Sequence, residues 1–163
     1  MLIDEPPALI SQPDWPQGLA AQVGAPHTAE GLPAFTAALR GPQAGAIAAG
    51  ALDSMITAQL PPGERAEILQ QMLLTGREAA SQLMFSNATQ DWRDLLAGIT
   101  VPVLVLGGGA SIFPATALEN LAAAIPGAAV RIIPAAGRGS HLSFLENPSA
   151  VNGAIREFLD STA

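Results

Sequence analysis

The sequence predicts an α/β fold, built on a short parallel sheet with flanking helices, and three observations lead to this prediction. Val101–Leu106 is a continuous aliphatic run of strand length, which is typical of a strand that helices cover on both faces. A helical pattern begins at Pro114 and runs to about residue 125, and a second strand-like run covers 130–133. A final helical pattern begins at Asn147. Strand, helix, strand and helix in this order form parallel βαβ architecture.

The part of the chain before Val101 has a different pattern, which is rich in helices and loops. Met1–Asp4 is a short apolar segment stopped by two prolines, and this is typical of the end of a strand. Thr28 is expected to cap the first helix. Between breaks at proline and glycine, helices are expected over 28–39, 44–60, 61–73 and 77–85, followed by a short turn over 91–96 that Asp91 caps.

Composition limits the class of protein. The chain has 163 residues, of which 49% are hydrophobic and 13% are charged, so a folded domain is expected and not a disordered segment. There are no cysteines, which excludes disulfides, thiolate metal sites and cysteine nucleophiles. Seven arginines stand against fourteen carboxylates, and a net charge of -7 makes nucleic acid a poor partner.

The sequence also indicates neither a membrane segment nor a cofactor site. No apolar run approaches the ~18 residues that cross a bilayer, and Asp4 and Glu5 stand where a secretory signal would be basic. We therefore expect a soluble, cytoplasmic protein without a membrane partner. Two histidines are too few for a histidine-rich metal site. Gly107–Gly109 is followed by Ile112-Phe113-Pro114, which does not suit a phosphate-binding helix start, so no cofactor or metal is expected.

Candidate catalytic groups follow three strands. In an open α/β sheet, functional residues lie on loops at the carboxyl ends of the strands. Asp4, Ser111 and His141 are each on such a loop, so the fold would bring them to one edge. A carboxylate that orients an imidazole, which in turn acts as base for a nucleophile, is the arrangement of a catalytic triad.

A family resemblance covers the whole chain, although its specific motifs occupy about half of it. The landmarks are Asp91-Trp92, the strand at 101–106 with the glycines after it, Ile125-Pro-Gly-Ala128, and above all Gly139-Ser-His-Leu-Ser-Phe-Leu-Glu-Asn-Pro148. This last segment resembles the catalytic-histidine loop of the α/β-hydrolases. The segment Leu2-Ile-Asp-Glu-Pro6 is similar to the end of that family's sixth strand, where many members have an aspartate before a proline.

The resemblance implies a partial α/β-hydrolase fold. Residues 1–7 would be the end of core strand 6, residues 8–90 a helical cap region, and residues 91–163 a C-terminal α/β segment containing strands 7 and 8. It implies a serine-type hydrolase acting on a small-molecule, ester-like or acyl substrate, with His141 as the base. Trp15, Phe85 and Phe113 are candidates to line the substrate pocket, although aromatic positions of this kind are more often plain core.

Two departures from the family pattern shape this prediction. Many members carry the acid after the seventh strand, where this chain has Ser111. Because some members carry the acid after the sixth strand, Asp4 is the first candidate for it, Asp91 the second, and Ser111 a supporting residue. In addition, the family's Gly-x-Ser-x-Gly nucleophile elbow does not occur in the sequence, and the nearest match is Gly137-Arg-Gly-Ser-His141. Ser140 is a poor nucleophile candidate because neighbouring residues on an extended loop point apart.

The expected nucleophile therefore lies outside this chain, which alone should be inactive or nearly so. An N-terminal hydrolase half or a second copy is expected to pair with the exposed sheet edge. The alternatives are a non-catalytic interaction module, a truncated remnant of a hydrolase, and a mis-started reading frame. Each candidate residue also has a structural interpretation: His141 as a loop histidine, Asp4 as a solvated strand-end carboxylate, and Ser111 as a helix cap.

Overall fold

A three-stranded parallel sheet organises the structure, which is a computed structural model describing residues 1–162. The strands lie in the order β1 (Leu2–Ile3), β4 (Leu104–Gly108) and β5 (Ala129–Ile133). Leu2 is paired with Val105, and Leu104 is paired with Ala129. The middle strand β4 is completely buried, as the sequence predicted for a strand covered on both faces.

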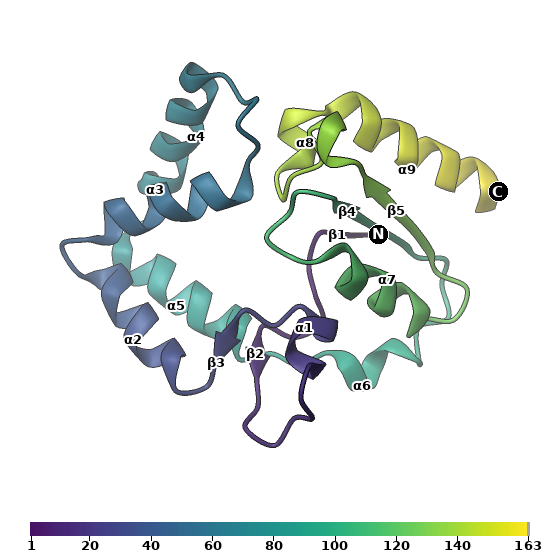
Figure 1. Cartoon of the computed structure of the whole chain (residues 1–163), viewed down its shortest axis with the longest axis horizontal. Helices are drawn as coiled ribbons and strands as arrows, with labels where there is room; N and C mark the ends of the chain where they lie inside the picture. The colour runs from purple at the N-terminus through teal and green to yellow at the C-terminus, as the bar shows by residue number, and fades with distance from the viewer. Residues whose placement is uncertain (163) are drawn as a thin grey trace.

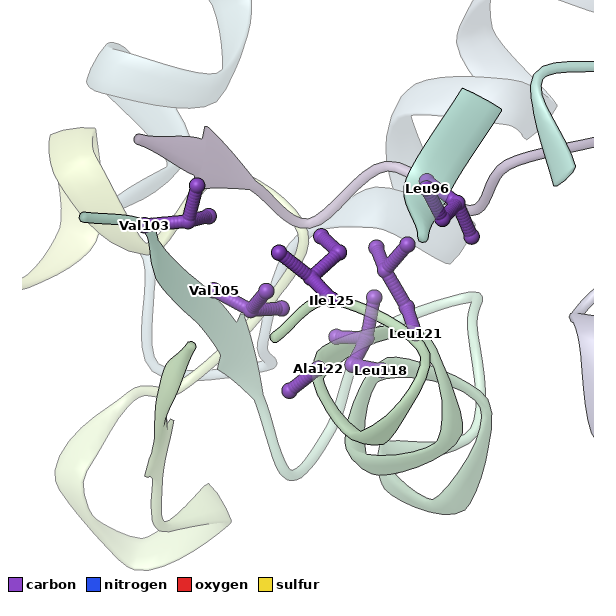
Figure 2. Close-up of a cluster of buried hydrophobic side chains, with 7 residues drawn as sticks. All are labelled: Leu96, Val103, Val105, Leu118, Leu121, Ala122 and Ile125. Atoms are coloured by element: carbon purple, nitrogen blue, oxygen red, sulfur yellow. The ribbon is translucent and has the colours of Figure 1, made fainter. Parts of the chain in front are cut away.

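Alternate residues of β4 pack on opposite layers of helices. Val105 belongs to an apolar cluster with α7 (Ala115–Ala123) and α6 (Arg93–Leu96), which Figure 2 shows in close-up. Leu104 and Leu106 point the other way and pack with Val151 of α9 (Pro148–Thr162). This alternation is the two-residue period of a strand, and it confirms the α/β fold class with helices on both faces.

Four helices gather on one side of the sheet, and we call them the helical lobe (Figure 1). They are α2 (Gly31–Arg40), α3 (Ala44–Met55), α4 (Pro62–Leu74) and α5 (Arg77–Ala88). The helix α2 packs chiefly against α5, and α3 against α4. Along the chain, three short elements come between β1 and the first helix of the lobe: β2 (Ile10–Ser11), α1 (Leu19–Val23) and β3 (His27–Thr28).

Several predicted boundaries need correction. The strand predicted over 101–106 begins instead at Leu104, because Val101 and Pro102 are exposed and proline has no N–H for pairing. It ends at Gly108, two residues later than predicted, and so includes two of the glycines that were expected to end it. The helix predicted over 44–60 ends at Met55. The helix predicted to end at Phe85 continues to Ala88. The sequence analysis missed α1, β2, β3, and the one-turn helix α8 (Ser143–Glu146) that follows the histidine loop.

In residues 1–162, no helix combines the length and the apolar character needed to cross a membrane.

Candidate active site

Asp4 lies directly after β1 and turns inward at the carboxyl edge of the sheet. Its backbone N–H donates to the Leu106 carbonyl at 2.7 Å, which continues the pairing of β1 with β4. Its φ is +48°, a left-handed conformation that aspartate and asparagine adopt more readily than most residues. The residue is only 1% exposed. A buried carboxylate is tolerated only when it is well hydrogen-bonded, so its partners define the site.

The loop after β4 supplies two of these partners. The Gly108 N–H donates to Asp4 Oδ1 at 3.2 Å, and the Ser111 hydroxyl donates to Asp4 Oδ2. Ser111 Oγ also accepts a hydrogen bond from the Phe113 N–H at 3.1 Å. Ser111 does not cap α7, whose N-cap is Pro114 without a side-chain cap hydrogen bond; it binds instead within the turn before that helix and holds the carboxylate.

His141 is the third partner and comes from the loop after β5. Its Nδ1 lies 2.7 Å from Asp4 Oδ2, across 137 residues of sequence. The edge of its ring meets the ring of Phe113, with 5.5 Å between the ring centroids. The His141 side chain is 19% exposed. In residues 1–162, no hydrogen bond is formed by the other ring nitrogen, Nε2.

This geometry fixes the chemistry of the imidazole. An ionised carboxylate only accepts hydrogen bonds, so Nδ1 must carry the proton that it shares with Asp4. In the neutral ring, Nε2 is then a free acceptor, and when Nε2 gains a proton the nearby carboxylate stabilises the imidazolium. The pair can thus take a proton at Nε2 and give it back.

Two glycines allow the histidine loop to approach the ends of β4 and β5. A Cβ at Gly108 would lie 2.4 Å from the carbonyl oxygens of both Gly139 and Ser140. A Cβ at Gly139 would lie 1.9 Å from the Ile133 carbonyl oxygen. All these neighbours are backbone atoms, so no side-chain rotation could relieve the clash. Only glycine at both positions permits this loop to place His141 over Asp4.

Asp91, the second candidate for the acid, lies elsewhere. Its Oδ2 is 2.6 Å from an Arg93 guanidinium nitrogen, and the Asp91 side chain is 40% exposed. This hydrogen-bonded Arg93 holds the pKa of the Asp91 carboxyl below its usual value. Asp91 also accepts at 3.1 Å from the N–H of Arg93, the first residue of the short helix α6. The structure pairs His141 with Asp4 and not with Asp91.

The three aromatic pocket candidates have different surroundings. Phe113 is buried against His141. Trp15 lies under the Arg93 guanidinium, whose carbon is 4.2 Å from the ring centroid. Phe85 is half-exposed on α5. In the described part of the chain, no aromatic pair joins Trp15 or Phe85 to His141.

The sequence did not reveal that the backbone N–H of Gly108 binds Asp4, nor which backbone atoms Gly108 and Gly139 approach. The available signals were Gly107–Gly109 at a strand end and Gly139 two residues before the histidine. A glycine run at a strand end indicates close backbone approach, but the sequence does not say which loop approaches.

Comparisons with known proteins identify the fold. No family model matches the sequence, and no curated protein matches it. Solved structures do match. The chain is similar to an esterase from Thermogutta terrifontis, with 27% identity, a TM-score of 0.71, and coverage of 93% of this chain and 53% of that one.

Two other solved structures agree. The enol-lactonase from Burkholderia xenovorans LB400 is 25% identical with a TM-score of 0.72, and the match covers 80% of this chain and 50% of that one. The bromoperoxidase from Bacillus anthracis is 17% identical with a TM-score of 0.78, and the match covers 95% of this chain and 55% of that one. The chain has the fold of the C-terminal part of an α/β-hydrolase, and it spans about half the length of these structures.

Proposed function

We propose that this chain is the C-terminal portion of a serine-type α/β-hydrolase that acts on an ester-like or other acyl substrate. In this proposal His141 is the catalytic base, Asp4 orients it, and the nucleophilic serine comes from a segment outside this chain. The observation that carries the proposal is the contact between His141 Nδ1 and buried Asp4 Oδ2 at 2.7 Å, at the carboxyl edge of a parallel sheet. The similarity to an esterase and an enol-lactonase supports the substrate class.

The mechanism follows from the free Nε2. That nitrogen takes the proton of the serine hydroxyl while the serine oxygen forms a bond to the acyl carbon. The tetrahedral intermediate then expels the leaving oxygen, which receives the same proton from Nε2, and an acyl-serine remains. Water repeats both steps, and the carboxylic acid and the free serine are restored. Asp4 stays ionised throughout and stabilises the imidazolium in each half of the cycle.

The partner would dock beside β1. In residues 1–162, β1 pairs only with β4, so its other edge has no strand neighbour. Beside it is an apolar hollow of about 420 Å³, lined by residues of β1, of the turn after it and of the α6 region: Leu2, Pro6, Pro7, Leu95, Leu96 and Ile99 among them. An unpaired edge next to apolar surface favours association with another polypeptide. An N-terminal hydrolase half is the proposed occupant, and a second copy of the chain is the competing outcome.

The test uses the chain alone and the chain together with the polypeptide encoded immediately upstream. A fluorophosphonate probe should not label the chain by itself, whereas the combined sample should be labelled and should hydrolyse an aryl ester. His141→Ala should reduce that turnover by at least about 10⁴-fold, as expected when a triad base is lost. His27→Ala is the matched control, because His27 is the chain's only other histidine, and it should leave turnover unchanged.

The competing interpretation is a non-catalytic interaction module or a remnant, and the absence of Gly-x-Ser-x-Gly from the sequence favours it. It predicts that the partner still binds and that His141→Ala changes nothing. Labelling of the isolated chain that disappears when one of its own serines is replaced would overturn the view that the nucleophile lies elsewhere.

A further inference from the structure

Glu146 is a buried charged residue that the proposed mechanism does not use. It ends the one-turn helix α8, which begins two residues after His141, and it is 1% exposed. Burying a carboxylate is strongly unfavourable unless other groups hydrogen-bond to it. The partners of Glu146 should therefore reveal what this burial achieves.

Both oxygens of Glu146 bind one residue of the helical lobe. The Thr57 N–H donates to Oε2 at 2.9 Å, and the Thr57 hydroxyl donates to Oε1 at 2.6 Å. Thr57 lies in the turn between α3 and α4, 89 residues away in sequence. Hydrogen bonds to an ionised acceptor are roughly twice as strong as neutral ones.

A third hydrogen bond joins the same two segments. The Leu142 N–H, immediately after His141, donates to the Met55 carbonyl at 3.2 Å. These three are the hydrogen bonds between residues 44–74 and residues 100–162 in the described part of the chain. In Figure 1 the turn between α3 and α4 reaches toward α8, in agreement with these bonds. We call this set of contacts the 57–146 clamp.

The clamp acts close to the catalytic pair. The Asp4 side of that pair is fixed by β1 and by the loop after β4. The His141 side is on a loop whose far end runs into α8, so a shift of α8 would move the imidazole relative to the carboxylate. A displacement of about 1 Å at a catalytic group can cost about 10²-fold in rate.

We propose that Glu146 is a positioning residue: by holding the turn between α3 and α4 against α8, it keeps His141 on Asp4 and links the seating of the helical lobe to the catalytic pair. The inference rests on the proposed function for its catalytic meaning. Its structural part, the dependence of the His141–Asp4 contact on Glu146, is measurable on this chain alone.

The experiment follows the His141 Nδ1 proton by NMR, because its downfield signal and slow exchange report the hydrogen bond to Asp4. Glu146→Ala should speed exchange of this proton and of the Thr57 amide by about tenfold, the fold-change that corresponds to a lost hydrogen bond. Glu146→Gln should restore both, since its carbonyl can accept from the Thr57 N–H and its amide can donate to the Thr57 hydroxyl. Leu145→Ala is the matched control on α8, because Leu145 is 47% exposed, and it should change neither signal.

The outcomes separate this inference from the proposed function. If Glu146→Ala folds and leaves the Nδ1 signal unchanged while Asp4→Asn abolishes it, the clamp is not a positioning device but the catalytic pair stands. If the parent chain shows no Nδ1 signal, the pair fails, and both proposals fail with it. If Glu146→Ala does not fold, Thr57→Val decides: it removes one hydroxyl of the clamp and should give faster Nδ1 exchange, and an unchanged rate would overturn the inference.

The same variants, tested in the chain combined with its upstream polypeptide (the combined enzyme), give turnover as a second measurement. Glu146→Ala should lower kcat and leave KM nearly unchanged, since it disturbs the base and not substrate binding, and Glu146→Gln should recover kcat. A rise in KM with kcat unchanged would instead assign Glu146 to the substrate site and contradict the positioning role.

Discussion

The strictest test of the site's architecture is Gly139→Ala. The added Cβ would lie 1.9 Å from the Ile133 carbonyl oxygen, 2.6 Å from the Ile133 carbonyl carbon and 2.9 Å from the Pro134 carbonyl oxygen. These are backbone atoms at the end of β5, so the histidine loop must move by more than about 1 Å to restore ordinary contact distances. Overpacking of this kind costs typically 1–3 kcal/mol, and we expect the upper end, about 3 kcal/mol, because the obstacle is backbone. For a domain of this size that corresponds to a fall in Tm of roughly 6–12 °C.

Gly137→Ala is the control in the same loop. A Cβ there would meet its nearest atoms, Asn147 Nδ2 and Ile133 Cγ2, at 3.9 Å, and its φ is not positive. Alanine should therefore fit, and by restricting the unfolded chain it should stabilise the protein by up to about 1 kcal/mol. Both variants are compared with the parent by thermal and urea unfolding. If Gly139→Ala is as stable as Gly137→Ala, the histidine loop does not fold closely against the end of β5, and the geometric basis of the site is wrong.

Three further predictions concern single side chains. In Asp4→Asn, asparagine can adopt the left-handed φ of +48° but cannot select the Nδ1–H tautomer of His141. In the chain combined with its upstream polypeptide, kcat for an aryl ester should therefore fall roughly 10⁴-fold. Near-parental turnover would remove Asp4 from the mechanism. Ser111→Ala removes a hydrogen-bond donor to the buried Asp4 carboxylate and should lower the free energy of unfolding, measured in urea, by about 1–2 kcal/mol. An unchanged free energy of unfolding would show that the hydroxyl does not stabilise Asp4. Burial lowers the pKa of His27, so the folded state binds its proton less tightly than the unfolded state, and stability should be lost as pH falls from about 6.5 through the folded pKa. His27→Phe keeps the stacking on Phe35 and should flatten this part of the stability profile, and an unchanged slope below pH 6.5 would contradict the assignment.

The sequence predicted best those elements whose signal is local. The buried strand β4 lies within a continuous aliphatic run, α7 and α9 carry a helical hydrophobic period, and prolines mark where α7 and α9 begin. The short elements were not predicted, because β2 and β3 have two residues each and, in residues 1–162, pair only with one another, which is too short for a detectable hydrophobic period. The end of α3 depends partly on a residue far away in the sequence. Beyond Met55, the Thr57 N–H donates to Glu146, a partner that the local sequence does not reveal.

For the site, the sequence predicted which loops carry the functional residues, but it did not predict the backbone and side-chain contacts that hold these loops together. Asp4, Ser111 and His141 all follow strands, and the rule for open α/β sheets brings such residues to one edge. The close approach of Gly108 and Gly139 is a contact between two backbones, and the sequence shows only that glycines are present. Glu146 appears in the sequence as an ordinary helical carboxylate, and only its burial marks it as unusual.

The relation between the catalytic pair and its loops is set by backbone contacts within this chain. The loop after β4 is tied to the histidine loop by the Ala110 N–H, which donates to the Gly139 carbonyl at 2.7 Å, and to the end of β5 by the Gly109 N–H, which donates to the Ile133 carbonyl at 2.8 Å. It is tied to Asp4 by the Gly108 N–H. The loop after β4 thus binds both the acid and the backbone two residues before the base. The acid–base pair is therefore preorganised before any nucleophile arrives, and a partner that supplied only a correctly placed serine and oxyanion donors would complete the site without having to reshape it.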